Sequence, residues 1–189
     1  MKKNFFLFFL ICVIISGIVS TYIYFTKHKS LDINTATTTQ SSAKDPISDQ
    51  TVEELLSSYS DLSLFADLLK KTNLDKLLSE KGPYTVFAPT NEAFSFLPSG
   101  SFTYLQQPQN GLILKQFLKY QIAQGNITTN LMSNKAHLIS LNGQESVEII
   151  DTNNYSILDA KGNKTLILKS NIRAKNGVIH IVGSVLLPQ

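Results

Sequence analysis

Residues 84–94 read YTVFAPTNEAF, and the rest of the chain is organised around this stretch. Its first part, Thr85 to Ala88, is a short apolar run that begins after Gly82-Pro83 and ends at Pro89. Short apolar runs bounded by Gly and Pro are typical of strands that are buried on both faces. The stretch therefore predicts a core strand, and it contains no obvious nucleophile, base or metal ligand.

The second part of the stretch predicts a capped helix. Thr90 follows the strand at the position of an N-cap, where its hydroxyl accepts from the free backbone N–H of Glu92 or Ala93. Glu92 also lies in the first helical turn, where the helix dipole favours a negative charge. Phe87 and Phe94 then become core anchors on either side of the cap.

Further helices are predicted before and after this stretch. Thr51 to Glu54 matches a capping box, and Asp61 is placed to cap a second helix with a leucine-rich apolar stripe. A shorter amphipathic turn covers 74–78, and residues 111–122 carry apolar side chains at helical spacing. We interpret the leucine-rich stripe as a core face, with a groove for a partner helix as the alternative.

From His137 onward, the pattern changes to short strands joined by turns. Asn142-Gly143, residues 161–163 and Asn176-Gly177 separate runs of strand-forming residues, and Asn-Gly favours the turn whose twist matches a hairpin. Helices followed by antiparallel strands predict an α+β domain rather than a succession of βαβ units.

Two blocks of this sequence resemble the two signature motifs of the fasciclin (FAS1) domain family. TVFAPTNEAF, within 84–94, resembles the first, and NGVIHIVGSVLLP, at 176–188, resembles the second. Two motifs in this order, about ninety residues apart, are far more specific than either alone. The signature positions are Thr85, Val86, Phe87, Ala88, Pro89, Thr90, Phe94, Asn176, Gly177, His180 and Pro188.

The resemblance covers roughly residues 47–188 and implies a fold. The fasciclin fold is a β-sandwich or wedge of antiparallel strands flanked by several short helices, which agrees with the α+β prediction. In that fold the two signature blocks pair as neighbouring strands of the core. We therefore expect a fasciclin-like domain over 47–189.

The N-terminal 29 residues are predicted to hold a membrane anchor. Residues 4–26 carry no acidic or basic side chain, and 23 helical residues span about 35 Å, which exceeds the ~30 Å hydrocarbon core. This length favours an uncleaved transmembrane helix, with a secretory signal cleaved near Ser20 as the alternative. Residues 30–46 are polar and aperiodic, which predicts a flexible tether of about 20–24 Å.

Charge and cysteine content exclude several classes of protein. From residue 47 onward the chain has 12 basic and 12 acidic residues, so this domain is neutral. It has no cluster of Lys or Arg interleaved with aromatic residues, and we predict no binding to nucleic acid. The single cysteine, Cys12, excludes a disulfide within the chain and a cysteine-based zinc site in the domain.

Tyr120, Gln121 and Ile122 are the candidate interaction residues. They fall where the family usually has a Tyr-His pair, which the resemblance associates with adhesion in animal members. Gln121 lacks the imidazole and its titration near neutral pH. The alternative is that Tyr120 is a core tyrosine whose hydroxyl has a hydrogen-bond partner.

The histidines do not form a predicted catalytic or metal site. His180 shares one face of its strand with Val178 and Val182, so we interpret it as buried and hydrogen-bonded rather than as a base or ligand. His137 has no Cys, Asp or Glu at metal-ligand spacing. We predict no catalytic residues, no metal and no cofactor.

These observations predict a non-catalytic adhesion or interaction module that binds a protein or glycan at a cell surface or envelope. The resemblance implies that the domain lies outside the cytoplasm, in the periplasm or at the cell surface, on a single-pass membrane protein. One alternative is an envelope enzyme or small-ligand-binding protein that uses Tyr120 and His180. Another is a structural envelope protein that associates with itself.

Overall fold

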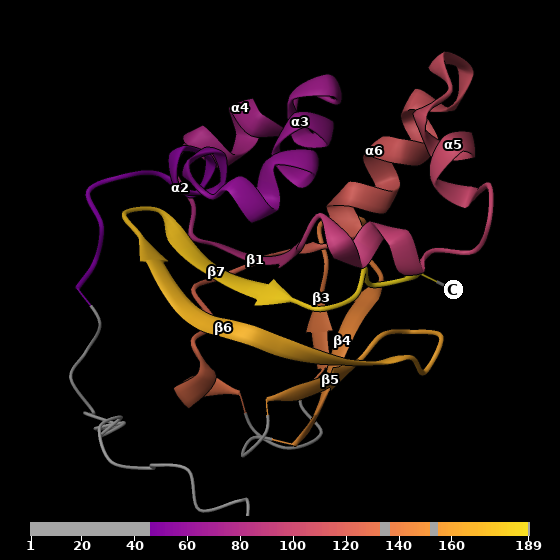
Figure 1. The fold of residues 1–189 in the computed structure, drawn as a ribbon. Coiled ribbons are helices and arrows are strands. Elements are labelled where there is room, and N and C mark those ends of the chain that lie inside the picture. Colours follow the sequence, from indigo (N-terminus) through magenta and orange to yellow (C-terminus); the bar gives the residue numbers. More distant parts are fainter. Residues whose placement is uncertain (1–45, 133–136, 152–154, 189) are drawn as a thin grey trace, which may run out of the picture. The chain divides into compact units, whose positions relative to one another are not determined.

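The domain combines a layer of helices with a curled sheet (Figure 1). The computed structural model describes residues 46–132, 137–151 and 155–188. The predicted anchor at 4–26 lies outside these ranges, as does nearly all of the predicted tether at 30–46. Among the helices of the three ranges, none combines the length and the apolar character that a membrane span requires.

The helices occupy mainly the first half of the described chain. The α-helices are α2 (Val52–Ser58), α3 (Ser63–Lys71), α4 (Leu74–Ser79), α5 (Ser101–Gln106) and α6 (Gly111–Tyr120). Short 3₁₀ helices are η1 (Ser60–Leu62), η2 (Glu92–Phe96), η3 (Pro108–Asn110) and η4 (Thr129–Leu131). The strands are β1 (Tyr84–Pro89), β2 (Ile122–Gln124), β3 (His137–Ile139), β4 (Glu145–Asp151), β5 (Ser156–Leu158), β6 (Lys164–Ala174) and β7 (Gly177–Val182).

The two signature blocks pair as neighbouring strands, which confirms that expectation. The strand order is β2-β1-β7-β6-β5-β4-β3, and β1 runs parallel to β7 with Phe87 opposite His180. The expectation of antiparallel strands is right for the other pairings and wrong for this one, because a long connection separates β1 from β7. A bridge between Ala123 and Ser140 joins β2 to β3, so the sheet curls until its two ends meet.

The β1–β7 pair separates two apolar clusters. Val86 and Ile179 face the cluster formed with the helices, whereas Phe87 and Val182 face the cluster inside the curled sheet. Every residue of both strands is buried. The prediction of a core strand buried on both faces is therefore confirmed.

The helix caps follow the prediction at one site and depart from it at another. Thr51 and Glu54 form the predicted capping box of α2. Asp61 does not cap α3; instead Asn91 accepts from the backbone N–H of Leu64 at 2.9 Å. Local sequence patterns reveal caps only within a few residues, and Asn91 lies far along the chain from this helix end.

The predicted helix after Thr90 is present as a short 3₁₀ helix. The hydroxyl of Thr90 accepts from the N–H of Ala93 at 3.2 Å, as expected, but the helix that follows is a single 3₁₀ stretch whose N-cap residue is Asn91. The predicted helix at 111–122 ends at Tyr120, because Ile122 begins a strand that pairs with β1. Helix α5 was not predicted from the sequence.

The predicted hairpins form, but their Asn-Gly turns differ from the two-residue turn that Asn-Gly favours. At Asn142-Gly143 only the glycine has positive φ, in a three-residue loop. In the β6–β7 hairpin, the loop is Lys175-Asn176 and neither residue has positive φ. Gly177 is required by space, since a Cβ there would lie 2.1 Å from the carbonyl oxygen of Tyr84.

Candidate functional site

His180 lies within the β1–β7 strand pair and is fully buried. Its Nε2 lies 2.9 Å from the carbonyl oxygen of Ile127, and its Nδ1 lies 3.4 Å from the backbone nitrogen of Asn171. Because a carbonyl only accepts and an amide N–H only donates, these partners fix the neutral tautomer with hydrogen on Nε2. Burial lowers the pKa of His180 to about 4, while the bond to Ile127 acts in the opposite direction.

Polar side chains of the signature strands form hydrogen bonds with the segment that follows β2. The ring of Phe87 stacks on His180 with the centroids 5.6 Å apart. The hydroxyl of Thr85 donates to the carbonyl of Gly125 at 2.7 Å and accepts from the N–H of Ile127 at 2.9 Å. This geometry agrees with the interpretation of His180 as a buried, hydrogen-bonded histidine.

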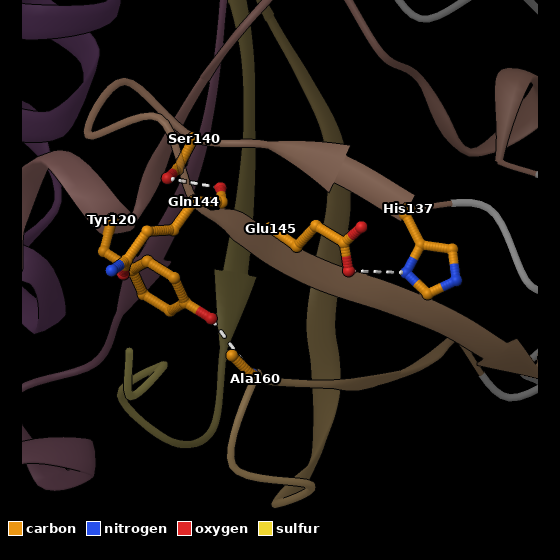
Figure 2. Close-up of polar contacts among 6 residues, drawn as sticks. All are labelled: Tyr120, His137, Ser140, Gln144, Glu145 and Ala160. Atoms are coloured by element: carbon orange, nitrogen blue, oxygen red, sulfur yellow. Dashed lines mark hydrogen bonds and ion pairs between the residues drawn. The ribbon is translucent and has the colours of Figure 1, made fainter. Parts of the chain in front are cut away.

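Tyr120, whose hydroxyl points to Ala160 in Figure 2, is fully buried. Its hydroxyl accepts from the backbone N–H of Ala160 at 3.0 Å. Burial raises the pKa of Tyr120, and the bond from Ala160 acts in the opposite direction. The hydroxyl therefore stays protonated at neutral pH and joins the end of α6 to the chain after β5.

Gln121 and Ile122 are also 0 % exposed. The amide of Gln121 accepts from the N–H of Leu186 at 3.1 Å and donates to its carbonyl at 2.8 Å, which fixes the C-terminal segment. Ile122 packs in the helix-side cluster. A direct contact between a partner and Tyr120, Gln121 or Ile122 would require this region to open, and their role in recognition stays a prediction.

An open groove of about 460 Å³ lies at the sheet end formed by β3, β4 and β5. The turn after β3 contributes Gln144, and the turn after β5 contributes Ala160 and Gly162. His137 and Glu145, both drawn in Figure 2, lie on its rim together with Glu148.

The groove has a charged rim. His137 Nδ1 lies 3.3 Å from Glu145 Oε2, and the two side chains are 48 % and 64 % exposed. Glu148 is the cross-strand partner of His137 in the β3–β4 register. Two carboxylates beside a single imidazole make this rim suited to a cationic or hydrogen-bond-donating group of a partner.

The chemistry of the groove favours binding over catalysis. None of the described residues that line it carries a hydroxyl or thiol nucleophile. Ser140, nearby in Figure 2, donates to the carbonyl of Gln144 at 2.9 Å and lies apart from His137. Across 46–132, 137–151 and 155–188, no three His, Cys, Asp or Glu side chains are grouped to hold a metal ion.

A family comparison covers both signature strands and this groove. The model of the fasciclin domain matches residues 60–188, which is more than half of the chain. The chain belongs to the fasciclin domain family. Its fasciclin domain therefore includes β1, β7 and every residue of the groove rim.

Relatives of this fasciclin domain occur in proteins of different size. Protein sll1483 of Synechocystis sp. is 33 % identical over 140 residues, which are 73 % of this chain and 73 % of that protein. Transforming growth factor-beta-induced protein ig-h3 of Oryctolagus cuniculus is 33 % identical over 138 residues, which are 73 % of this chain but 19 % of that protein. The chain thus corresponds to about a fifth of the rabbit protein.

A solved structure shares the fold. The FAS1 domain pair from the insect cell adhesion molecule fasciclin I superimposes with a TM-score of 0.58 at 19 % identity. The match covers 73 % of this chain and 51 % of the other. At this identity the likeness establishes the fasciclin fold of the domain.

The groove of this fasciclin domain was not predicted from the sequence, although one signal was present. His137 has no carboxylate at metal-ligand spacing along the chain. The predicted hairpin around Asn142-Gly143 nevertheless implied that residues of the next strand would lie opposite His137. Glu148 lies opposite His137, and Glu145, which lies opposite Ile139, contacts the ring of His137 with its side chain.

Proposed function

We propose that this protein is a non-catalytic, extracytoplasmic adhesion or interaction module, held at a membrane by an anchor within residues 1–29. Membership of the fasciclin family supports the proposal, as does the fold shared with an insect cell adhesion molecule. The partner is a protein or glycan of a cell surface or envelope. The anchor fixes location, the tether at 30–46 supplies reach, and the domain presents the binding face.

One observation carries this proposal. The polar side chains of the signature strands and of the 120–122 segment are buried and already bonded to backbone groups, as at His180, Tyr120 and Gln121. Such groups stabilise the fold and are not free to act on a substrate. Recognition then depends on exposed side chains, and the rim formed by Glu145, Glu148 and His137 is the candidate contact face.

Affinity capture tests the proposal. The full chain in detergent is used as bait for extracts of bacterial envelopes and for eukaryotic surface and matrix material. We expect saturable enrichment of a protein or glycan that is lost in a Glu145→Gln, Glu148→Gln double variant and kept in Glu92→Gln, an exposed carboxylate elsewhere. Enrichment that is unchanged in the double variant would exclude the groove as the contact face. No enrichment from either source would contradict the proposed interaction module.

Self-association is the second candidate, because the start of α6 exposes adjacent apolar side chains. Leu112 is 82 % exposed and Ile113 is 46 % exposed, and both precede the buried Leu114. Sedimentation velocity over a range of concentrations separates this candidate from the first. A mass that rises with concentration, and that Leu112→Ser returns to the monomer, would establish it. An envelope enzyme would instead show turnover that His180→Ala abolishes in a folded protein.

A further inference from the structure

A second hollow, of about 340 Å³, lies at the β6–β7 turn and has a cationic rim. Lys81, Arg173 and Lys175 line it, together with Ile47 and Asn126, and none of its described lining residues is acidic. It lies outside the groove of β3 to β5, with which it shares no lining residue. Figure 1 places the β6–β7 turn beside α2, where the described chain begins.

Two glycines of the lining, Gly82 and Gly177, pack directly against neighbouring backbone. A Cβ at Gly82 would lie 2.1 Å from the carbonyl oxygen of Asn176, and a Cβ at Gly177 would lie the same distance from that of Tyr84. The β6–β7 turn therefore packs directly on the backbone that leads into β1. Arg173 near the end of β6, Lys175 in the turn that follows it, and Lys81 line the hollow.

The three cations are not neutralised locally. Across the three described ranges, no carboxylate forms an ion pair with Lys81, Arg173 or Lys175. Lys175 contributes to the lowered pKa of the Glu54 carboxyl, after the larger effect of the bonds from Thr51. Those bonds hold the Glu54 carboxylate on the capping box of α2.

The other acidic neighbours lie outside the lining. Glu80 precedes Lys81, and Asp49 follows Ile47 by two positions; both are exposed to solvent. The hollow therefore gathers three basic side chains with no acidic residue in its described lining, and basic side chains are the groups that recognise a phosphate or sulfate.

We propose that this hollow binds the phosphate groups of anionic phospholipids in the membrane that carries the chain. Ile47, at the end of the tether, lines the hollow and is 54 % exposed. A flexible coil of the predicted tether's length has a root-mean-square span of about 20–24 Å, so we expect that end of the domain to stay near the bilayer. The inference rests on the membrane anchor of the proposed function, and it adds a second, charge-dependent contact that fixes the orientation of the domain.

The test uses the full chain reconstituted in lipid nanodiscs. Cys12→Ser removes the native thiol, and Gln124→Cys places a fluorophore on an exposed residue two positions from Asn126. The discs contain phosphatidylcholine alone or an equal mixture with phosphatidylglycerol, and both carry a quencher on the lipid head groups. With three basic residues at the surface, we expect the docked-to-free ratio to rise on the order of a hundredfold on anionic discs at low salt.

A matched pair of variants assigns that effect to the hollow. The triple variant Lys81→Gln, Arg173→Gln, Lys175→Gln is expected to abolish the difference between the two kinds of disc. The triple variant Lys70→Gln, Lys76→Gln, Lys164→Gln removes the same charge from exposed positions outside the hollow. It is expected to keep most of the difference between the discs. Equal quenching on both discs, or equal loss in both variants, would overturn the proposal.

Two further readouts separate this proposal from its alternatives. Co-elution of the chain with neutral discs reports the anchor alone, and its failure would overturn the membrane part of the proposed function together with this inference. Soluble dextran sulfate is added to chains on neutral discs as a second anion. A response to dextran sulfate without a response to anionic lipid would assign the hollow to a soluble polyanion and overturn the lipid site.

Discussion

The centre of the sheet and the groove at its β3–β5 end each contain a histidine, in opposite environments. His180, in β7, is fully buried, neutral and bonded on both ring nitrogens. His137, in β3, is about half exposed and contacts an exposed carboxylate on the rim of a groove. The first histidine is part of the structure that defines the fold, and the second is available to a partner. Substitutions at the centre of the sheet should therefore alter the free energy of unfolding, and substitutions at the groove should alter binding.

The largest expected effect is at Phe87, in the centre of the sheet. Phe87→Ala removes a fully buried ring that stacks on His180, and the cavity should lower the free energy of unfolding by about 3–5 kcal/mol. Denaturant unfolding measures the change. The control is Phe96→Ala, since that ring is 66 % exposed and its loss should change stability by less than about 0.5 kcal/mol. Similar values for the two variants would mean that β1 is not a core strand.

The next effect is the loss of stability in acid that His180 causes. Its pKa is about 4 when folded and 6.5 when unfolded, so the unfolded chain binds a proton first as the pH falls. The stabilising contribution is complete above pH 6.5 and is lost as the pH falls through about 4, by roughly 3 kcal/mol in all.

The pH effect is isolated by comparison with His180→Gln, which keeps an amide donor and removes the titration. Denaturant unfolding of both proteins across this pH range gives the difference. We expect the wild type to lose more stability than the variant as the pH falls from neutral. Parallel pH profiles would show that His180 does not titrate as a buried neutral base.

A smaller effect is expected at Asn176, which joins helices to the sheet. Its Oδ1 accepts from the N–H of Val52 at 2.8 Å, and its Nδ2 donates to the carbonyls of Leu78 and Glu80 at 2.8 and 2.7 Å. Asn176→Ala leaves the start of α2 and the end of α4 without these partners, which should cost about 2 kcal/mol.

Asn130 supplies the matched control, because it is exposed on η4. Asn130→Ala should leave the midpoint of denaturant unfolding nearly unchanged. If Asn176→Ala behaves in the same way, then water replaces its bonds without loss and the helix caps depend on other contacts.

The sequence predicted what local patterns encode. The apolar run at β1, the capping box at Thr51 and the hairpin positions follow from neighbouring residues, and the paired signature blocks followed from family resemblance. What it missed depends on contacts between distant residues. Asn91 caps α3 across the fold, and Gly177 is needed because another backbone lies against it. The charged groove was missed for another reason, since its rim combines side chains from two strands whose hairpin was predicted but whose register was not.

The smallest effect on stability is expected at His137. A substitution there tests most directly whether the groove differs in role from the centre of the sheet. The contact between His137 and Glu145 is solvent-exposed on both sides, so His137→Gln should change the free energy of unfolding by less than about 0.5 kcal/mol. The same variant should weaken capture of the partner, because it removes the imidazole that contacts Glu145 on the groove rim. His180→Gln should do the reverse, since its side chain is buried and reaches no partner. If His137→Gln lowers stability and leaves capture intact, the groove rim is part of the core structure, and the binding face lies elsewhere on the domain.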